Sequence, residues 1–151
     1  FVPVHGIVNE VGSGDTLLRE TDVKRLDTLL WQALKNQTLI RSKMGHQPRL
    51  YSRVEYSTDE FHIGTLDDGL KLVQETPDAE LRNITDVVLD VDDLLADLST
   101  HTDHIEHIHL IADRHLTVKT DGETGGSDHL VSALREVVGT DSVTEVDPYG
   151  E

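Results

Sequence analysis

Residues 77–99, PDAELRNITDVVLDVDDLLADLS, are the stretch from which the expected fold of this chain is built. Six of its apolar residues follow one another at steps of three, four, three, four and three positions: Leu81, Ile84, Val88, Val91, Leu95 and Leu98. This spacing places them on one face of a helix, because an α-helix repeats about every 3.6 residues. Thr76 can cap such a helix, and Pro77 is tolerated in its first turn. The stretch therefore predicts one long amphipathic helix from about 77 to 99, with aspartates on its other face.

The chain before this helix predicts a further helix and a small sheet. Apolar residues recur at helical spacing within 22–36, namely Leu26, Leu29, Leu30, Ala33 and Leu34, with Trp31 at the edge of the stripe. Residues 38–44 and 49–56 are strand-like and flank a turn at 45–48, and Phe61 and Ile63 alternate in a candidate third strand.

The chain after Ser99 mixes helix and strand signals. Residues 104–112 fit either a strand or part of a second helix that would run to Arg114. A strand is expected over 115–121, a loop over 122–126, a helix from Ser127 that Gly139 ends, and a last strand over 142–147. The whole chain therefore predicts an α+β fold: a helix packed on a small, mostly antiparallel sheet, then the long amphipathic helix and a smaller α/β lobe. We expect a single domain over 1–151, with two lobes, 1–75 and 76–151, as the alternative.

The composition indicates a saline environment. The chain carries 29 acidic and 13 basic residues, a formal net charge of −16, and its acids are spread along the sequence. Such a surface stays hydrated where salt screens charge within about 3 Å at roughly 1 M, so the composition resembles that of proteins from extreme halophiles or their viruses. No apolar run reaches the roughly 18 residues of a membrane span, and the absence of cysteine excludes thiolate chemistry. We expect a location in a high-salt cytoplasm or in a virion.

One acidic motif resembles an enzyme signature. Residues 87–93, VVLDVDD, look like the first motif of haloacid-dehalogenase-type phosphatases, an apolar strand that ends in Asp-x-Asp. The resemblance implies that Asp90 would be the nucleophile and Asp92 the general acid or base. Leu94 departs from the Thr or Val of that family, few residues follow the motif, and the motif lies within the predicted helix. We therefore expect no catalytic residues and no enzyme activity.

Nine histidines form the second candidate for chemistry. Four of them, His101, His104, His107 and His109, lie close together in the sequence, and imidazoles are good ligands for divalent transition metals. On a helix the first two or three would share a side, whereas on a strand His107 and His109 would share a face. No His-Glu-x-x-His pattern is present, so the expectation is no cofactor, with a transition metal at these four histidines as the alternative.

Residues 93–121 also resemble a helix-turn-helix followed by a wing, the arrangement of many DNA-binding regulators. The recognition helix would run from Asp103 to Arg114, and it would present Asp103, Glu106 and histidines to the groove. Bases and phosphates are normally contacted by Arg, Lys, Asn or Gln, so nucleic acid is disfavoured as a partner.

The preferred function is therefore a non-catalytic interaction or assembly module, such as a head–tail or tail component of a halophilic virus. We expect protein subunits as partners in a homo- or hetero-oligomer, and a DNA-binding regulator or a histidine metal site is the alternative. The candidate contact residues are the six apolar residues of the predicted long helix, together with a basic group around the first hairpin, Arg41, Lys43, Arg49 and Arg53.

Overall fold

The computed structural model describes residues 3–6, 19–37, 48–58, 60–73 and 88–149, and every structural statement below concerns these residues. Their α-helices are α1 (Glu20–Gln37), α2 (Asp92–Thr100) and α3 (Ser127–Val138). Short 3-10 turns lie at η1 (Asp67–Gly69), η4 (Thr102–His104) and η5 (Thr140–Ser142). The strands are β1 (Leu50–Tyr56), β2 (Lys71–Val73), β3 (Val88–Asp90), β4 (Ile105–Ala112), β5 (Thr117–Thr120), β6 (Glu123–Gly125) and β7 (Val143–Glu145). The fold is α+β, as the sequence predicted.

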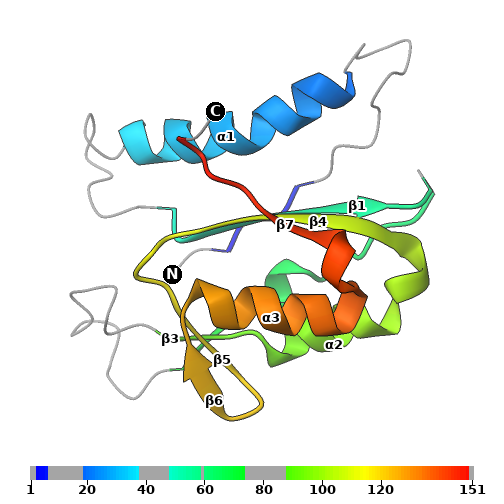
Figure 1. Cartoon of the computed structure of the whole chain (residues 1–151), viewed down its shortest axis with the longest axis vertical. Helices are drawn as coiled ribbons and strands as arrows, with labels where there is room; N and C mark the ends of the chain where they lie inside the picture. The colour runs from blue at the N-terminus through cyan, green and yellow to red at the C-terminus, as the bar shows by residue number, and fades with distance from the viewer. Residues whose placement is uncertain (1–2, 7–18, 38–47, 59, 74–87, 150–151) are drawn as a thin grey trace.

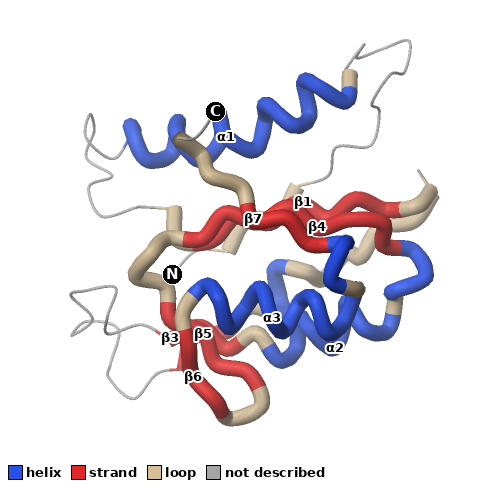
Figure 2. Tube along the Cα trace, viewed as in Figure 1, coloured by secondary structure: helices blue, strands red, loops and turns tan. Residues whose placement is uncertain are grey.

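The strands form two mixed sheets. The first has the order β1-β4-β7, with β1 antiparallel and β7 parallel to β4. The second has the order β2-β3-β5-β6, in which only the central pair, β3 and β5, is parallel. Helix α1 lies on one side of the first sheet, and α2 and α3 lie on the other side, next to the second sheet (Figures 1 and 2).

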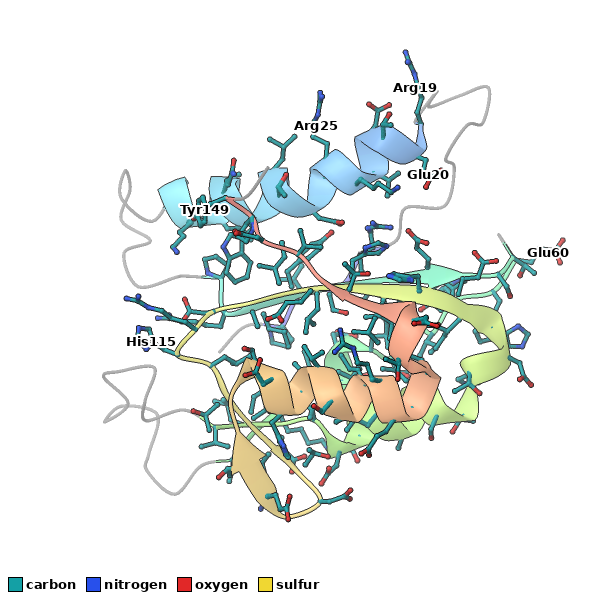
Figure 3. The ribbon with its side chains drawn as sticks, in the orientation of Figure 1. Arg19, Glu20, Arg25, Glu60, His115 and Tyr149 are labelled. Carbon is teal, nitrogen blue, oxygen red and sulfur yellow. The ribbon has the colours of Figure 1, made fainter. Side chains whose placement is uncertain are left out.

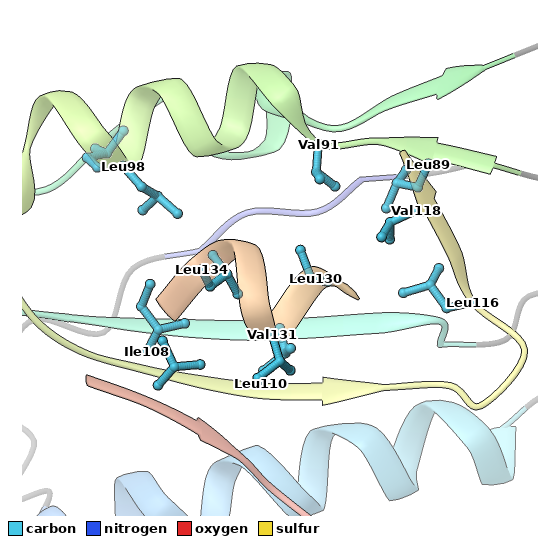
Figure 4. Close-up of a cluster of buried hydrophobic side chains, with 12 residues drawn as sticks. Leu89, Val91, Leu98, Ile108, Leu110, Leu116, Val118, Leu130, Val131 and Leu134 are labelled. Atoms are coloured by element: carbon cyan, nitrogen blue, oxygen red, sulfur yellow. The ribbon is translucent and has the colours of Figure 1, made fainter. Parts of the chain in front are cut away.

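The main core lies between the first sheet and helices α2 and α3. Ile108 and Leu110 of β4 alternate toward this side, where they meet Leu98 of α2 and Leu130 and Leu134 of α3 (Figure 4). All five side chains are almost completely buried. Alternate residues of a strand point to opposite faces, so the remaining face of β4 is available to α1.

The predicted long helix over 77–99 is wrong in its described part. Val88–Asp90 form a strand that is paired on both sides, with β2 and with β5, and the helix begins only at Asp92. Val91 continues the parallel ladder by donating its N–H to the carbonyl of Lys119 at 3.1 Å. Leu89 and Val91 point into the core, and Val88 is partly buried. Together with the leucines of α2, the apolar residues of this strand gave a helix-like spacing. Residues 77–87 lie outside the described part of the chain.

The stretch that could have been a recognition helix is also a strand. Residues Ile105–Ala112 form β4, the central strand of the first sheet, and pair with β1 over its whole length. The alternation of buried Ile108 and Leu110 with histidines matches the two-residue period of a strand. The helix-turn-helix reading is therefore wrong.

Several local predictions are confirmed. Helix α1 covers the predicted 22–36, β1 covers most of 49–56, β5 lies within 115–121 and β7 lies within 142–147. Helix α3 begins at Ser127 and ends before Gly139, whose φ of 105° is unfavourable for residues with a side chain. The predicted strand at Phe61 and Ile63 is absent, because these residues lie in a loop between β1 and η1.

Segments from both sides of the proposed lobe boundary share the same sheets. β1 pairs with β4, and β2 pairs with β3. Ile63 also belongs to the same buried cluster as Leu89 and Leu134. The two-lobe alternative remains a prediction, and the boundary proposed for it, 75–77, lies outside the described residues.

Candidate functional site

A buried ion pair joins α1 to the first sheet. The carboxylate of Asp27, with a side chain only 3% exposed, faces β1. Arg53 donates from Nε to Oδ1 of Asp27 at 2.7 Å and from Nη2 to Oδ2 at 3.0 Å. The hydroxyl of Tyr51 donates to the same Oδ1 at 2.7 Å. This bidentate geometry satisfies both carboxylate oxygens and fixes where α1 sits over the sheet.

The polar contacts continue across the same face of the sheet. Arg53 donates from Nη1 to Oε1 of Glu55 at 2.6 Å, and that oxygen is 2.9 Å from Nε2 of His109. The ring of His109 lies 4.6 Å from the ring of His107, whose Nε2 is 2.6 Å from the hydroxyl of Thr144. A row of polar side chains therefore runs from α1 through β1 and β4 to β7.

Burial and hydrogen bonding shift the pKa values of four side chains in this row. Burial lowers the pKa of His109, and the charge of Arg53 lowers it further, against the opposing effect of Glu55. For Glu55, burial would raise the pKa, but hydrogen bonds from Arg53 and His109 outweigh it, and the pKa is lowered. For Arg53, burial would lower the pKa, but its bonds to Asp27 and Glu55 raise it. Burial and the bond to Asp27 raise the pKa of Tyr51. The row thus favours neutral His109 between charged Arg53 and Glu55.

The structure divides the four candidate metal-binding histidines into two pairs. His107 and His109 share one face of β4 and are engaged with Thr144 and Glu55. His101 and His104 lie beyond the end of α2, where both rings contact Phe61. No group of three or more His, Asp or Glu side chains within the described ranges is arranged to hold a metal ion.

The candidate contact residues of the predicted long helix fall mostly in the core. Val91 and Leu98 are 0% and 1% exposed, and Val88 and Leu95 are partly buried. Leu81 and Ile84 lie outside the described residues. The described members of this group therefore pack inside the chain, since strand β3 and helix α2 both contribute to the main core.

The basic group around the first hairpin is largely paired within the chain. Arg53 is held by Asp27 and Glu55, and Arg49 lies 3.3 Å from Oδ2 of Asp113. Arg41 and Lys43 lie outside the described residues. Arg114 is an exposed basic residue in the turn between β4 and β5, and its Nε donates to Nε2 of exposed His115 at 3.0 Å.

The Asp-x-Asp motif does stand at the end of a strand. Asp90 ends β3, and its Oδ1 accepts the N–H of Asp92 at 3.0 Å. Oδ1 of Asp92 in turn accepts the N–H of Asp121 at 2.9 Å. One reason for setting the phosphatase resemblance aside, the helical conformation, is therefore wrong. The departure at Leu94 remains, and the described contacts use both carboxylates to join β3, α2 and the β5–β6 turn.

An open hollow lies beside this motif. It is lined by Thr65, Asp68, Gly69, Lys71, Asp93, Ala96 and Asp97. Lys71 forms an ion pair with Asp93, and this contact raises the pKa of Lys71.

Sequence reasoning missed an apolar surface on α1. The residues that face the sheet are Val23, Asp27 and Trp31, which recur at intervals of four. Leu29, Leu30 and Leu34 are 51%, 41% and 53% exposed, so most of the apolar stripe points away from the core. A buried aspartate among these residues was not predicted, because its partner Arg53 lies 26 positions away in the sequence.

The fold and these surfaces define a small α+β protein with two mixed sheets, a partly buried polar row and an exposed apolar helix face. No family model matches the chain. Over 149 residues it is 42% identical to the CRISPR-associated protein Cas7 of Haloferax volcanii. The match covers 99% of this chain but only 43% of that protein, so the chain spans less than half the length of its relative.

This similarity corrects the predicted function. The match is to a CRISPR-associated protein, so the virion component and the DNA-binding regulator are wrong as predictions of function. Metal binding by the four histidines is a separate prediction that this match does not test. The relative comes from a haloarchaeon, in agreement with the halophilic origin inferred from the acidic composition. Within the described residues, no helix is long and apolar enough to cross a membrane.

Proposed function

We propose that this chain is part of a CRISPR-associated protein that acts as a non-catalytic subunit of an RNA-guided complex in a high-salt cytoplasm. The observation that supports this proposal is the identity of 42% over nearly the whole chain to a CRISPR-associated protein. In RNA-guided complexes, the target sequence is recognised by base pairing with the guide RNA. The protein binds the guide through the shape and the sugar-phosphate backbone of the RNA. Nucleic acid is then a partner, against the expectation drawn from the acidic residues and histidines of the candidate recognition helix.

The partners in this proposal also include other protein subunits, either copies of this chain or different proteins. The exposed face of α1 favours such contacts, because contiguous exposed leucines are typical of interaction surfaces. Arg25 is exposed on the same helix (Figure 3). Lys35 is also exposed, with its Nζ over the ring of Tyr149 at 5.4 Å, on a chain whose net charge is −16. A cationic and apolar helix face complements the acidic surfaces that halophilic proteins present.

In this proposal, the row of polar side chains from α1 to β7 serves to position α1. The ring Nε2 atoms of His107 and His109 are already engaged with Thr144 and Glu55, so we propose that the row needs no metal cofactor. Its function would be to hold α1, and with it the exposed leucines, at a fixed place over the first sheet.

The test is purification of the tagged chain from a halophilic host in molar salt, followed by sequencing of the bound RNA and identification of the bound proteins. The proposal expects short RNAs that contain CRISPR repeat sequence, together with other CRISPR-associated proteins. An unrelated halophilic acidic protein carrying the same tag is the control. Recovery of neither the RNAs nor the proteins above this control would contradict the proposal.

A further inference from the structure

Four rings gather where β1 and α2 end. Phe61, in the loop after β1, stacks on His104 with 4.1 Å between ring centroids and 23° between ring planes. His101 approaches the same phenyl ring at 5.1 Å, and Tyr56 meets it edge-on at 5.7 Å. The four residues come from two segments of chain, 56–61 and 101–104, which only the tertiary structure brings together.

The backbone holds this ring cluster in place. Ser57 donates its N–H to the carbonyl of His104 at 2.8 Å, and His104 donates its own N–H to the carbonyl of His101 at 3.0 Å. The hydroxyl of Tyr56 accepts the N–H of Ile63 at 3.1 Å, which closes the loop that carries Phe61. The rings are therefore positioned before any ligand arrives.

The ring cluster extends from the core to the solvent. Phe61 is partly buried and packs against the main core, whereas His104 is exposed. Since Phe61 covers one face of the His104 ring, the exposed area of His104 belongs to its edge and its outer face. An exposed flat ring backed by a second ring is the kind of platform on which unpaired bases stack.

The charge around the platform is negative. Glu60, Asp103 and Glu106 are exposed neighbours of Phe61 and His104 in the sequence. At low salt these carboxylates repel phosphates. In molar salt such repulsion is screened within about 3 Å, and the counterion-release gain of basic phosphate contacts is also lost. Base stacking depends neither on charge attraction nor on counterion release, so it can stabilise a nucleic-acid contact in molar salt.

We propose that the outer face of His104, backed by Phe61, is a stacking site for an unpaired base of single-stranded RNA. The identity of the ligand as RNA rests on the proposed function, whereas the platform itself rests on the ring geometry. Base stacking tolerates any sequence, so the site would hold the strand without reading it.

The first test uses a single nucleoside without a phosphate. Adenosine is titrated into the whole chain in 2 M KCl while the ring-proton NMR signals of the histidines are followed. The site predicts ring-current shifts for His104 and smaller ones for His101, and no shift for exposed His62, which lies one residue from Phe61. Absence of a shift at His104 at saturating adenosine would overturn the site.

The second test uses single-stranded RNA and two substitutions at the same position. In 2 M KCl, His104→Ala should weaken the binding of a labelled oligonucleotide about tenfold, the scale of one lost base stack. His104→Phe keeps a flat ring and should bind like the original chain, as should the control His62→Ala. Equal binding by His104→Ala, or failure of His104→Phe to restore binding, would contradict the site.

The outcomes of these experiments distinguish a failure of the stacking site from a failure of the proposed function. If adenosine shifts His104 but no CRISPR-derived RNA is recovered from the host, the stacking site stands and the proposed function is wrong. If CRISPR-derived RNA is recovered but His104→Ala binds RNA normally, the proposed function stands and the stacking site is wrong.

Discussion

Arg53 and Asp27 form a two-point contact across the interface between α1 and β1, with Nε to Oδ1 at 2.7 Å and Nη2 to Oδ2 at 3.0 Å. The side chains are 12% and 3% exposed. The helix is therefore attached to the sheet by a buried ion pair flanked by Val23 and Trp31, while most of its leucines face outward.

Removal of one partner of this pair should be costly. Asp27→Ala leaves the Arg53 guanidinium largely buried without its main partner, and such a loss destabilises proteins by about 3–5 kcal/mol. Urea unfolding in molar salt measures the change. Glu136→Ala, which removes an exposed carboxylate on α3, is the control and should change the free energy of unfolding by less than about 0.5 kcal/mol. Equal effects of the two substitutions would show that the pair does not hold α1.

The stability of the chain should fall as the pH falls. The pKa values of His109 and Glu55 are both lower in the folded chain than their ordinary values, so the unfolded chain binds more protons and the free energy of unfolding rises with pH. The contribution of His109 should be complete above about pH 6.5, the ordinary histidine pKa, and decline below it, with that of Glu55 declining further below about pH 4.3. Charged Arg53 and the ring of His107 adjoin both groups.

His109→Gln separates the two contributions. Thermal unfolding from pH 8 to pH 4 should show a weaker decline between pH 7 and pH 5 for His109→Gln than for the original chain. Exposed His115→Gln is the matched control and should follow the original curve. A His109→Gln curve parallel to the original over this range would rule out the assigned shift.

The exposed leucines of α1 should affect association and not folding. The double substitution Leu30→Ser with Leu34→Ser should change the free energy of unfolding by less than about 1 kcal/mol, because both side chains are half exposed. It should reduce the recovery of partner subunits, as measured by quantitative mass spectrometry of the purified complex. By contrast, Leu134→Ala in α3 removes a core side chain and should cost about 2–5 kcal/mol. Unchanged recovery with the double substitution would exclude this face as a contact.

The turn between β4 and β5 offers a test of phosphate contacts. Under the proposed function, Arg114→Ala should weaken RNA binding and reduce the slope of log affinity against log salt by about 0.7, the value for one phosphate on a single strand. Fluorescence anisotropy over a salt series measures this slope. Arg135→Ala, an exposed arginine on α3, is the control. Equal slopes for the two variants would remove Arg114 from the RNA contact.

Some of the architecture could be predicted from local patterns. Helix α1 and helix α3 have helical apolar spacing, and Gly139 marks the end of α3. The alternation in β1 indicated a strand, and its Leu50, Val54 and Tyr56 do pack together on the core side. The acidic composition indicated the saline origin, since charge on a surface reflects the solvent and does not depend on the fold.

The conformation of 88–98 could not be decided from its own pattern. Leu89 and Val91 are apolar because they point into the core, and Leu95 and Leu98 are apolar because α2 packs on the same core. Strand and helix joined at Asp92 reproduce the spacing of one longer helix. Only the pairing with β2 on one side and with β5, about 29 residues further along, on the other distinguishes the two.

The sequence alone therefore determined the class of fold, the ends of the regular elements with clear periodicity and the kind of solvent, because local spacing and total charge are properties of the chain itself. The tertiary structure decided which face of α1 is buried, how the four histidines divide, and that Phe61 backs His104. These depend on contacts between residues about 26 to 43 positions apart, such as Asp27 with Arg53 and Phe61 with His104, and no local pattern carries that information.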